Sequence, residues 1–417
     1  MRRLERKEPL TANIMATRRK PAKVEEPVRR RSDETEFSKL LAQIEKDRGE
    51  KIILPANVIP PACCIPTGAF TLDFALMGGL PEGFATMIYG LESSGKTTMT
   101  LKSVAAFQRK HPNKLAVWVD TESMFDPDWA AKLGCDLKRL HIVHPATGEE
   151  AVDLMAAAME PIEVGMVIMD SIPGCVPKAV VDRSAEDQTM AVLARLMGIF
   201  CSKILTAWGK ERRRNHRVTV LIINQFRSKV GLVFGDPRTL PGGRQINHMP
   251  STKIEIKNSE VMGEDAVGNE VVDLNDHTFK ITKAKHGSSI RSGQFQMVIN
   301  PDKDEHLAQG DFEDFKTVIT FAKKFGLLAG GGGKYRLPII TDQFFPKHDD
   351  IIEFFKQSPE LFETMKAYLI AAQRLSKGMP ALPPDGYLIA PHVELDLSLI
   401  GEASAIEPLP DDVDAAE

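Results

Sequence analysis

The 417-residue sequence lacks the features that mark several specialised classes of protein. It has no apolar run near the roughly 20 residues that a membrane-spanning helix requires, so no membrane partner is expected. The start of the chain has no apolar core of the kind that secretory signals carry. The five cysteines have no metal-binding spacing, and the adjacent Cys63 and Cys64 are a poor disulfide pair. These absences favour a reducing, cytoplasmic environment in which the cysteines act as small apolar residues.

The charge of the chain is unevenly distributed. The formal net charge is only -4, and 43% hydrophobic with 26% charged residues is ordinary for a soluble globular protein. Residues 1–31, however, contain eleven Lys or Arg against four Glu, and residues 394–417 contain eight acids and no base. The basic residues 1–31 suggest an anionic partner. The acidic residues 394–417 suggest a segment that competes with such a partner for a basic surface or modulates its binding. Two solvated, disordered ends explain each stretch equally well.

A complete phosphate-binding motif, G-x-x-x-x-G-K-T, spans Gly90 to Thr97. Its glycines, Gly90 and Gly95, let the backbone wrap closely around phosphate oxygens, and the start of the following helix presents partial positive charge. Lys96 is expected to reach the β- and γ-phosphates, and the Thr97 hydroxyl to ligate Mg²⁺. An apolar strand before the motif, at 85–89, and a helical pattern after it supply the required context. The sequence therefore predicts a nucleoside triphosphate site rather than a chance glycine turn.

Acidic side chains follow two other apolar strands. Residues 164–169 end at Asp170, and an acid at this edge of a phosphate-loop protein orients Mg²⁺. Residues 115–119 precede Asp120 and Glu122, and ATP hydrolysis needs a carboxylate that polarises the attacking water. Glu122 is the candidate for this role and Asp120 the second choice. Taken alone, Asp170 is also explained as a turn residue, and the other two acids as a helix cap.

A third strand ends in amide side chains and leads into a long basic loop. Gln225 follows the apolar run 218–223 and is expected to contact the γ-phosphate and relay its presence. The next eighteen or so residues, 226–243, contain basic side chains and glycines, and a loop of this length calls for a functional reason. Basic groups and exposed glycine N–H groups suit a nucleic-acid backbone. A mobile surface loop is the alternative explanation.

Alternating strands and helices indicate an α/β fold with a mostly parallel sheet, helices on both faces and an antiparallel addition at one end. Further strands are expected at 140–143, 253–256, 279–283 and 294–298, and helices at 149–159 and 190–208. A short helix capped by Ser32 or Asp33, with a strand at 51–54, precedes this core. Helices at 312–325, 349–356 and 359–375, around a flexible glycine run at 330–333, predict a small α-rich domain after it.

These motifs resemble the RecA family of strand-exchange recombinases over about residues 33–375. The resemblance rests on residues 90–98 (with Leu91 where proline is usual), 71–76 with 79–83, 120–127, 170–171 and 177–178. It implies a RecA-like P-loop ATPase core with a mostly parallel twisted sheet, a short N-terminal helix-strand polymerisation element and a small α-rich C-terminal domain. The expected divisions are 1–31 (basic disordered tail), 32–60 (oligomerisation element), 61–300 (ATPase core with two DNA-binding loops), 301–376 (C-terminal domain) and 377–417 (acidic disordered tail).

The resemblance also implies roles for individual residues in an ATP site. Glu122 becomes the catalytic glutamate, Asp126 the adenine-side aspartate, and Trp129 the ring that stacks on adenine. The remaining nucleotide contacts come from the loop itself, namely Gly90, Glu92, Ser93, Ser94, Gly95, Lys96, Thr97 and Thr98. Lys283 and Lys285 resemble paired lysines that reach a neighbouring subunit's ATP, which would make the site composite. Residues 41–46 resemble the element that docks on that neighbour.

Two segments resemble DNA-binding loops. Residues 182–189 match the first, with Arg195 on the helix after it, although the usual glycines are missing. The second follows Gln225, and Val230 would wedge between stacked base triplets. The phosphate contacts implied for the DNA strand come from Arg195, Arg227, Lys229, Gly242 and Gly243. Residues 210–217 are longer and more basic than the usual link, which suggests either an extra DNA-facing patch or a solvated hairpin.

The function that the resemblance implies is ATP-dependent homologous recombination and DNA repair by a divergent bacterial or phage protein. Filaments formed with ATP and Mg²⁺ on single-stranded DNA would pair that strand with homologous double-stranded DNA. Two alternatives remain open: a ring-forming DNA motor or helicase on the same core, and an ATP-sensing assembly protein with vestigial hydrolysis. The polymerisation element and the paired lysines argue against the first, and Glu122 argues against the second.

Overall fold

The computed structural model describes residues 35–48, 63–181, 190–228, 238–264, 270–287, 290–301 and 306–381, together with residues 395 and 400. The chain forms two compact units, residues 1–54 and residues 55–417. Within the first, the described structure is helix α1, Glu36–Arg48. Its N-terminal cap is Thr35, whose hydroxyl accepts a hydrogen bond from the Ser38 N–H at 3.2 Å. The cap expected at Ser32 or Asp33 is therefore wrong, and the strand expected at 51–54 lies outside the described residues.

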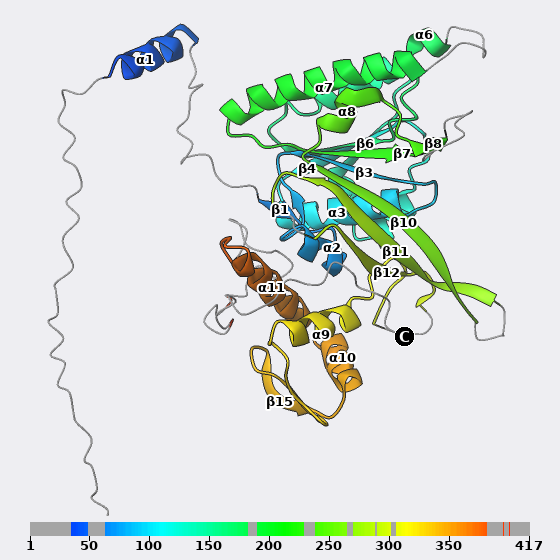
Figure 1. Cartoon of the computed structure of the whole chain (residues 1–417). Coiled ribbons are helices and arrows are strands. Elements are labelled where there is room, and N and C mark those ends of the chain that lie inside the picture. The colour runs from blue at the N-terminus through cyan, green and yellow to red at the C-terminus, as the bar shows by residue number, and fades with distance from the viewer. Residues whose placement is uncertain are drawn as a thin grey trace, which may run out of the picture. The chain divides into compact units, whose positions relative to one another are not determined.

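An eight-stranded sheet forms the centre of the second unit (Figure 1). Its strand order is β12-β11-β10-β3-β7-β6-β4-β5. The six strands from β10 to β5 are parallel, and β11 and β12 add to β10 in antiparallel fashion, as the sequence predicted. The bounds are β3 Ala85–Gly90, β4 Leu115–Asp120, β5 Leu140–Val143, β6 Val164–Asp170, β7 Thr219–Gln225, β10 Thr252–Glu264, β11 Glu270–Ala284 and β12 Ser292–Val298. The strands β10 and β11 are much longer than their apolar cores predicted, because polar residues continue the hairpin.

Helices cover both faces of the sheet, so the parallel strands are apolar on both sides. On β3, for example, Ile88 packs with helices α2, α3 and α4, whereas Met87 packs with α5, α7 and α8. The helix bounds are α2 Phe70–Ala75, α3 Lys96–Lys110, α4 Pro127–Lys132, α5 Gly148–Ala157, α7 Met190–Arg213 and α8 Gly243–His248. The residues from Ala191 to Arg213 of α7 are long and apolar enough to cross a membrane. Its side chains Phe200 and Ile204 are buried in the core that α7 shares with α5 and the sheet.

Short elements complete this core. Strands β1 and β2 pair with each other, as do β8 and β9 at the two ends of the second loop. Their bounds, with those of two short helices, are β1 Cys64–Ile65, β2 Leu80–Pro81, β8 Arg227–Ser228, β9 Arg238–Thr239, α6 Lys178–Val181 and η2 Leu137–Arg139.

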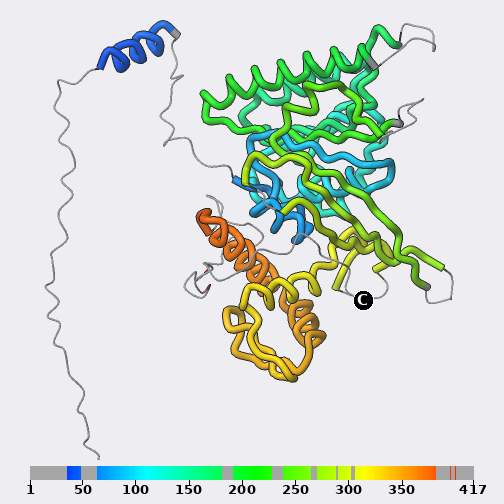
Figure 2. The backbone as a smooth tube through the Cα atoms, in the orientation of Figure 1, coloured from blue at the N-terminus to red at the C-terminus, as the bar shows by residue number. Residues whose placement is uncertain are grey.

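The C-terminal part contains three helices and a small sheet that the sequence analysis missed (Figure 2). The helices are α9 Phe315–Lys324, α10 His348–Gln357 and α11 Pro359–Ser376, and the antiparallel strands are β13 Ala329–Gly331, β14 Lys334–Leu337 and β15 Thr341–Phe345. The glycine run expected to be flexible instead forms the β13–β14 turn, in which Gly332 and Gly333 have φ angles of +62° and +86°. Such angles suit glycine in a tight hairpin.

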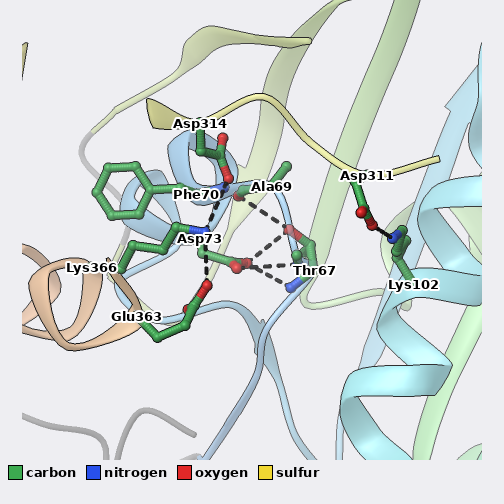
Figure 3. A network of polar contacts seen from close by, with 10 residues as sticks. Thr67, Ala69, Phe70, Asp73, Lys102, Asp311, Asp314, Glu363 and Lys366 are labelled. Atoms are coloured by element: carbon green, nitrogen blue, oxygen red, sulfur yellow. Dashed lines mark hydrogen bonds and ion pairs between the residues drawn. The ribbon is translucent and has the colours of Figure 1, made fainter. Parts of the chain in front are cut away.

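A buried polar network joins the C-terminal part to helix α2 of the central α/β core (Figure 3). The Asp314 carboxylate accepts a hydrogen bond from the Phe70 N–H of α2 at 3.1 Å and lies 3.4 Å from the Lys366 ammonium of α11. Lys366 also pairs with Glu363 at 3.1 Å. Phe70 and Phe74 of α2 pack into the apolar core formed by α9, α10 and α11. Because these groups are buried, loss of one partner would leave an uncompensated charge and cost several kcal/mol.

The basic segment 210–217 is neither a solvated hairpin nor a free loop. Helix α7 continues through Arg213, and the chain then turns back through Asn215 into β7. Glu211 and His216 are both 2% exposed, and their side chains lie 2.9 Å apart. This anchored turn leaves the neighbouring arginine side chains on a fixed part of the surface.

The C-terminal end of α3 is held by a buried acid. The carboxylate of Glu82 lies 2.8 Å from the Lys110 ammonium and 2.9 Å from the His111 ring. Burial alone would raise the pKa of Glu82, but the hydrogen bonds and positive charges of His111 and Lys110 outweigh burial and lower its pKa to about 2. The ionised carboxylate is therefore a stabilising feature of the folded chain.

This ion pair predicts an acid-sensitive part of the stability. Because the folded pKa lies below the unfolded one, the stabilisation is complete above the unfolded pKa and is lost as the pH falls towards about 2. The substitution Glu82→Gln should lower the free energy of unfolding by about 3 kcal/mol at pH 7 and by less than half of that near pH 3. Urea unfolding at both pH values measures the difference, with the exposed Glu353→Gln on α10 as control. An equal loss at both pH values would contradict the prediction.

Candidate active site

The phosphate-binding loop leaves β3 at the carboxyl edge of the sheet and enters α3. Gly95, the residue before α3, has a φ of +82°, and a Cβ there would lie 2.7 Å from the His277 ring. A Cβ on Gly90 would lie 2.2 Å from the carbonyl oxygen of Ile256 on β10. Both glycines are therefore required by packing as well as by any phosphate. Ser93, with a φ of +58°, completes the tight turn, and Glu92 is exposed beside it.

Lys96 lies inside this loop. Its ammonium donates hydrogen bonds to the Leu91 carbonyl at 2.5 Å and to the Ser94 hydroxyl at 3.4 Å. Burial lowers the pKa of Lys96, and the nearby charges of Asp170 and Glu122 oppose this effect. An ammonium at the start of a helix, with the free N–H groups of the first turn, forms a cradle for an anion such as a triphosphate.

Thr97 and Asp170 lie together across the loop. The Thr97 hydroxyl donates to the Asp170 carboxylate at 3.1 Å. Burial, with the negative charges of Glu122 and Asp120, raises the pKa of Asp170 to about 7. A site with this excess of acids suits a cation. No cluster of three or more Asp, Glu, His or Cys side chains in the described residues has the geometry to hold a metal. The Thr97 hydroxyl and the Asp170 carboxylate are oxygen ligands of the kind that suits Mg²⁺, which is commonly held by one or two protein groups and by phosphate oxygens.

The structure separates the roles of the two acids after β4. Both carboxylate oxygens of Asp120 accept backbone hydrogen bonds, from Glu122 at 3.1 Å and from Phe125 at 2.9 Å, so Asp120 shapes the turn. Glu122 is exposed, and its carboxylate accepts a hydrogen bond from the Ser171 hydroxyl that follows β6. This geometry favours Glu122 as the carboxylate available to a water molecule.

Gln225 ends β7 beside the phosphate-binding loop. It pairs with Gly90 in the β3–β7 register, and the Phe226 N–H donates to the Gly90 carbonyl at 3.1 Å. The Asn224 side chain donates to the Pro241 carbonyl at 3.2 Å and so ties the strand to the far end of the second loop. The amide pair at this strand end is thus linked both to the nucleotide loop and to the loop that leaves it.

The adenine-side candidates lie at α4. The Asp126 carboxylate caps this helix by accepting from the N–H groups of Asp128 and Trp129 at 2.9 and 3.0 Å. The Trp129 indole N–H donates to the Thr98 hydroxyl at 3.2 Å, which holds the half-buried ring beside α3. Both residues therefore lie beside the helix that follows the phosphate-binding loop.

His277 is a site neighbour that the sequence analysis missed. Its ring is 2% exposed, packs under Gly95 and stacks on Phe295 with ring centroids 4.9 Å apart. Burial lowers its pKa to about 4, so the neutral imidazole supports the loop from below. A single histidine within a strand carries no sequence signal for this position.

Several of the expected DNA-binding residues are brought together. Gly242 and Gly243, with φ angles of +94° and +79°, pack against Met197 and Ala194 of α7, next to the exposed Arg195. Arg227 is exposed where β8 begins the second loop. Lys229, Val230 and residues 182–189 lie outside the described residues.

The paired lysines lie at the opposite ends of the strands from the phosphate-binding loop. Lys283 pairs with Lys253 on β10, and its ammonium donates to the His248 carbonyl at 2.5 Å. The Lys285 N–H donates to Ser251, whose own N–H donates to Ala85 at the start of β3. These lysines therefore lie near the amino ends of the strands whose carboxyl ends hold the phosphate-binding loop. They do not complete the nucleotide site of their own subunit.

Comparisons with known proteins agree with this arrangement. The family described as the RecA N-terminal domain matches residues 35–302. Protein RecA of Frankia alni is 31% identical over 326 residues, which cover 77% of this chain and 87% of that protein. Protein RecA of Nostoc punctiforme is 32% identical over 75% of this chain and 81% of its own length, and that of Oceanobacillus iheyensis is 38% identical over 55% and 66%. These relatives do not favour the ring-forming motor, and the chain belongs to the RecA family of ATP-dependent DNA recombinases.

Proposed function

We propose that this RecA-family ATPase uses Mg²⁺ and ATP to assemble into a helical filament on single-stranded DNA and pairs that strand with homologous double-stranded DNA in the cytoplasm of a bacterial or phage-infected cell. The observation that carries the proposal is the placement of Lys96, Thr97, Asp170, Glu122 and Gln225 at one edge of the sheet. The loop that follows Gln225 suits a nucleic-acid backbone, because basic groups and glycine N–H groups contact phosphates of any sequence.

Each side chain has a definite part in hydrolysis. Lys96 and the N–H groups of the loop hold the phosphates, while Thr97 and Asp170 hold Mg²⁺. The bound metal supplies positive charge that stabilises the transferring phosphoryl group. Glu122 orients the attacking water and accepts its proton. The bond that breaks joins the γ-phosphorus to the bridging oxygen of the leaving nucleoside diphosphate. Asp126 and Trp129 contact the adenosine.

Gln225 couples the nucleotide to DNA. A contact between the γ-phosphate and Gln225 favours one position of the end of β7. The Asn224–Pro241 hydrogen bond transmits this change of position to the end of the second loop. Arg227, Lys229, Gly242 and Gly243 then bind the strand's phosphates, with Arg195 beside them, and Val230 inserts between bases. Loss of the γ-phosphate reverses these contacts and releases DNA, so nucleotide state and DNA affinity are linked.

We also propose a division of the chain into functional parts. Residues 32–60 serve as the oligomerisation element, and α1 supports this role because Phe37 and Leu40 on it are 62% and 54% exposed. Residues 61–300 form the ATPase core and 301–376 the C-terminal domain. The basic tail 1–31 and the acidic tail 377–417 flank them.

The role of Glu122 predicts a separation of binding from turnover. The variant Glu122→Gln keeps the shape and the hydrogen bond from Ser171 but removes the proton acceptor. It should bind ATP and single-stranded DNA as the unaltered protein does and lose at least about a hundredfold in DNA-stimulated ATPase rate. A coupled ATPase assay and fluorescence anisotropy of labelled DNA measure both. Loss of DNA binding with turnover intact would assign Glu122 another role.

The position of the paired lysines predicts a composite site. Lys283→Ala/Lys285→Ala should bind ATP as a dilute monomer but lack ATPase activity, and Lys96→Ala should lack activity for want of phosphate contacts. Mixed in equal amounts, the two variants should recover up to about a quarter of full activity, because one random interface in four joins an intact loop to intact lysines. ATPase activity of the mixture on DNA is the measurement. No recovery despite co-assembly would show that the lysines act within their own subunit.

A further inference from the structure

The two ends of the second loop are joined by an arginine that lies on a phenylalanine ring. Strands β8 and β9 pair Arg227 with Thr239 and Ser228 with Arg238, so the chain that leaves β7 lies beside the chain that leads to α8. The Arg238 guanidinium lies over the Phe226 ring, 4.9 Å from its centroid. Such a contact orders an arginine side chain and leaves its N–H groups able to pair with a carboxylate.

The same arginine faces a buried carboxylate. Glu255 on β10 is 9% exposed, and one of its carboxylate oxygens lies 3.7 Å from the Arg238 guanidinium and 3.7 Å from the Lys257 ammonium. That oxygen accepts no hydrogen bond from the described residues. A buried oxygen without a hydrogen bond costs free energy, and a small movement of Arg238 would supply one. The Arg238–Glu255 pair is therefore a contact that a change at the second loop can tighten or loosen.

The Phe226 ring continues this set of contacts to β3. It packs edge-on against the Tyr89 ring, with centroids 5.4 Å apart and an angle of 82° between the ring planes. Tyr89 is 5% exposed and directly precedes Gly90, the first residue of the phosphate-binding loop. Aromatic pairs in this geometry attract each other beyond the effect of burial and prefer a fixed relative orientation. A movement of Phe226 therefore displaces the Tyr89 ring.

Tyr89 in turn contacts both neighbours of Lys283. Its hydroxyl forms a hydrogen bond of 2.8 Å with the hydroxyl of Thr282, the residue before Lys283 on β11. Burial raises the pKa of Tyr89, so the hydroxyl keeps its proton at neutral pH. The Lys253 ammonium lies over the same ring, 5.2 Å from the centroid, and Lys253 pairs with Lys283 in the β10–β11 register.

We propose that Arg238 and Tyr89 are positioning residues of the DNA-dependent reaction, which link the second loop to Lys283 through the Phe226 ring and the Thr282 hydroxyl. The contacts cross four strands that lie side by side, β7, β3, β10 and β11 (Figure 1). The proposal rests on the proposed function, because it requires DNA at the second loop and a nucleotide within reach of Lys283. Arg238 and Tyr89 do not touch that nucleotide; they fix the position of the lysine that does.

This connection is distinct from the one that begins at Gln225. Gln225 lies beside the phosphate-binding loop of its own subunit, whereas the contacts through Tyr89 lead to a lysine at the opposite ends of the strands. Coupling between two sites requires a physical contact whose geometry differs between the two states. The long Arg238–Glu255 separation identifies that contact, and the pair closes to hydrogen-bonding distance when DNA occupies the loop.

Two single substitutions test the proposal in the full chain. Arg238→Gln removes the charge over Phe226, and Tyr89→Phe removes only the hydroxyl that binds Thr282. Each should lower the ATPase rate at saturating single-stranded DNA at least about fivefold, the factor that one lost hydrogen bond or cation–ring contact supplies. The ATPase rate without DNA and the KM for ATP should change by less than about twofold, because neither side chain touches the nucleotide. Unchanged DNA-stimulated rates in both variants would overturn the proposal.

A conservative variant and a direct alternative sharpen this test. Arg238→Lys keeps a positive charge beside Glu255 and should recover about half of the rate that Arg238→Gln loses. Excess DNA should not restore the rate of Arg238→Gln, because the defect lies after DNA binding. Full recovery at excess DNA would instead assign Arg238 a direct contact with DNA and would also overturn the proposal.

The double variant Arg238→Gln/Tyr89→Phe distinguishes one connected path from two independent losses. If both side chains act through Phe226, the double variant should be about as slow as the slower single variant. Independent effects multiply, to roughly 25-fold from two fivefold losses, and that result would contradict a shared path.

The matched controls lie on β14 of the C-terminal part. Arg336→Gln removes a guanidinium that lies over the Phe344 ring at 5.9 Å, and Tyr335→Phe removes the hydroxyl of the preceding tyrosine. Both should keep the DNA-stimulated rate of the unaltered protein. If DNA failed to stimulate the unaltered protein, the proposed function itself would be wrong. That outcome differs from stimulation that survives in both the Arg238 and the Tyr89 variants, which rejects the positioning role alone.

Discussion

The close packing of β3 between β7 and β10 is the constraint on which the site depends. At the end of β3 the backbone passes so near the Ile256 carbonyl that only glycine fits at position 90. On the other side, the Gly90 carbonyl accepts the Phe226 N–H. The first residue of the phosphate-binding loop is thus held by both neighbouring strands. A shift of the phosphate-binding loop must move β7, which leads into the second loop, or β10, which pairs with the strand that carries Lys283.

Because the central strands are parallel, different side chains gather at the carboxyl ends and at the amino ends of the strands. Carboxyl ends of β3, β4, β6 and β7 meet at one edge, which gathers the phosphate-binding loop, the acids and the amides. The antiparallel strand β11 runs the other way and returns its lysines to the amino edge. One sheet therefore carries a nucleotide site at one end and positive side chains at the other.

Much of this arrangement was predictable because it depends on short-range rules. Apolar runs followed by acids or amides identified the strand ends at Asp170 and Gln225, and the glycine spacing identified the loop. The long β10–β11 hairpin was underestimated because its outer half is polar and paired only by backbone hydrogen bonds. The small C-terminal sheet was missed because glycine-rich turns resemble flexible linkers in sequence. His277 and the aromatic contacts of Arg212 depend on residues far apart in the chain, which no local pattern reveals.

The basic turn after α7 is firmly anchored within the subunit, and this anchoring bears on the entropy of its arginine side chains. A long arginine side chain loses much conformational freedom when a contact forms, and an unattached one would oppose association by that amount. Stacking on Phe84 and Trp208 orders Arg212 before any partner arrives. Burial of Glu211 and His216 fixes the backbone beneath it. The fold thus meets the entropic cost of ordering Arg212 within one subunit, so that a group that binds its guanidinium need not meet this cost again.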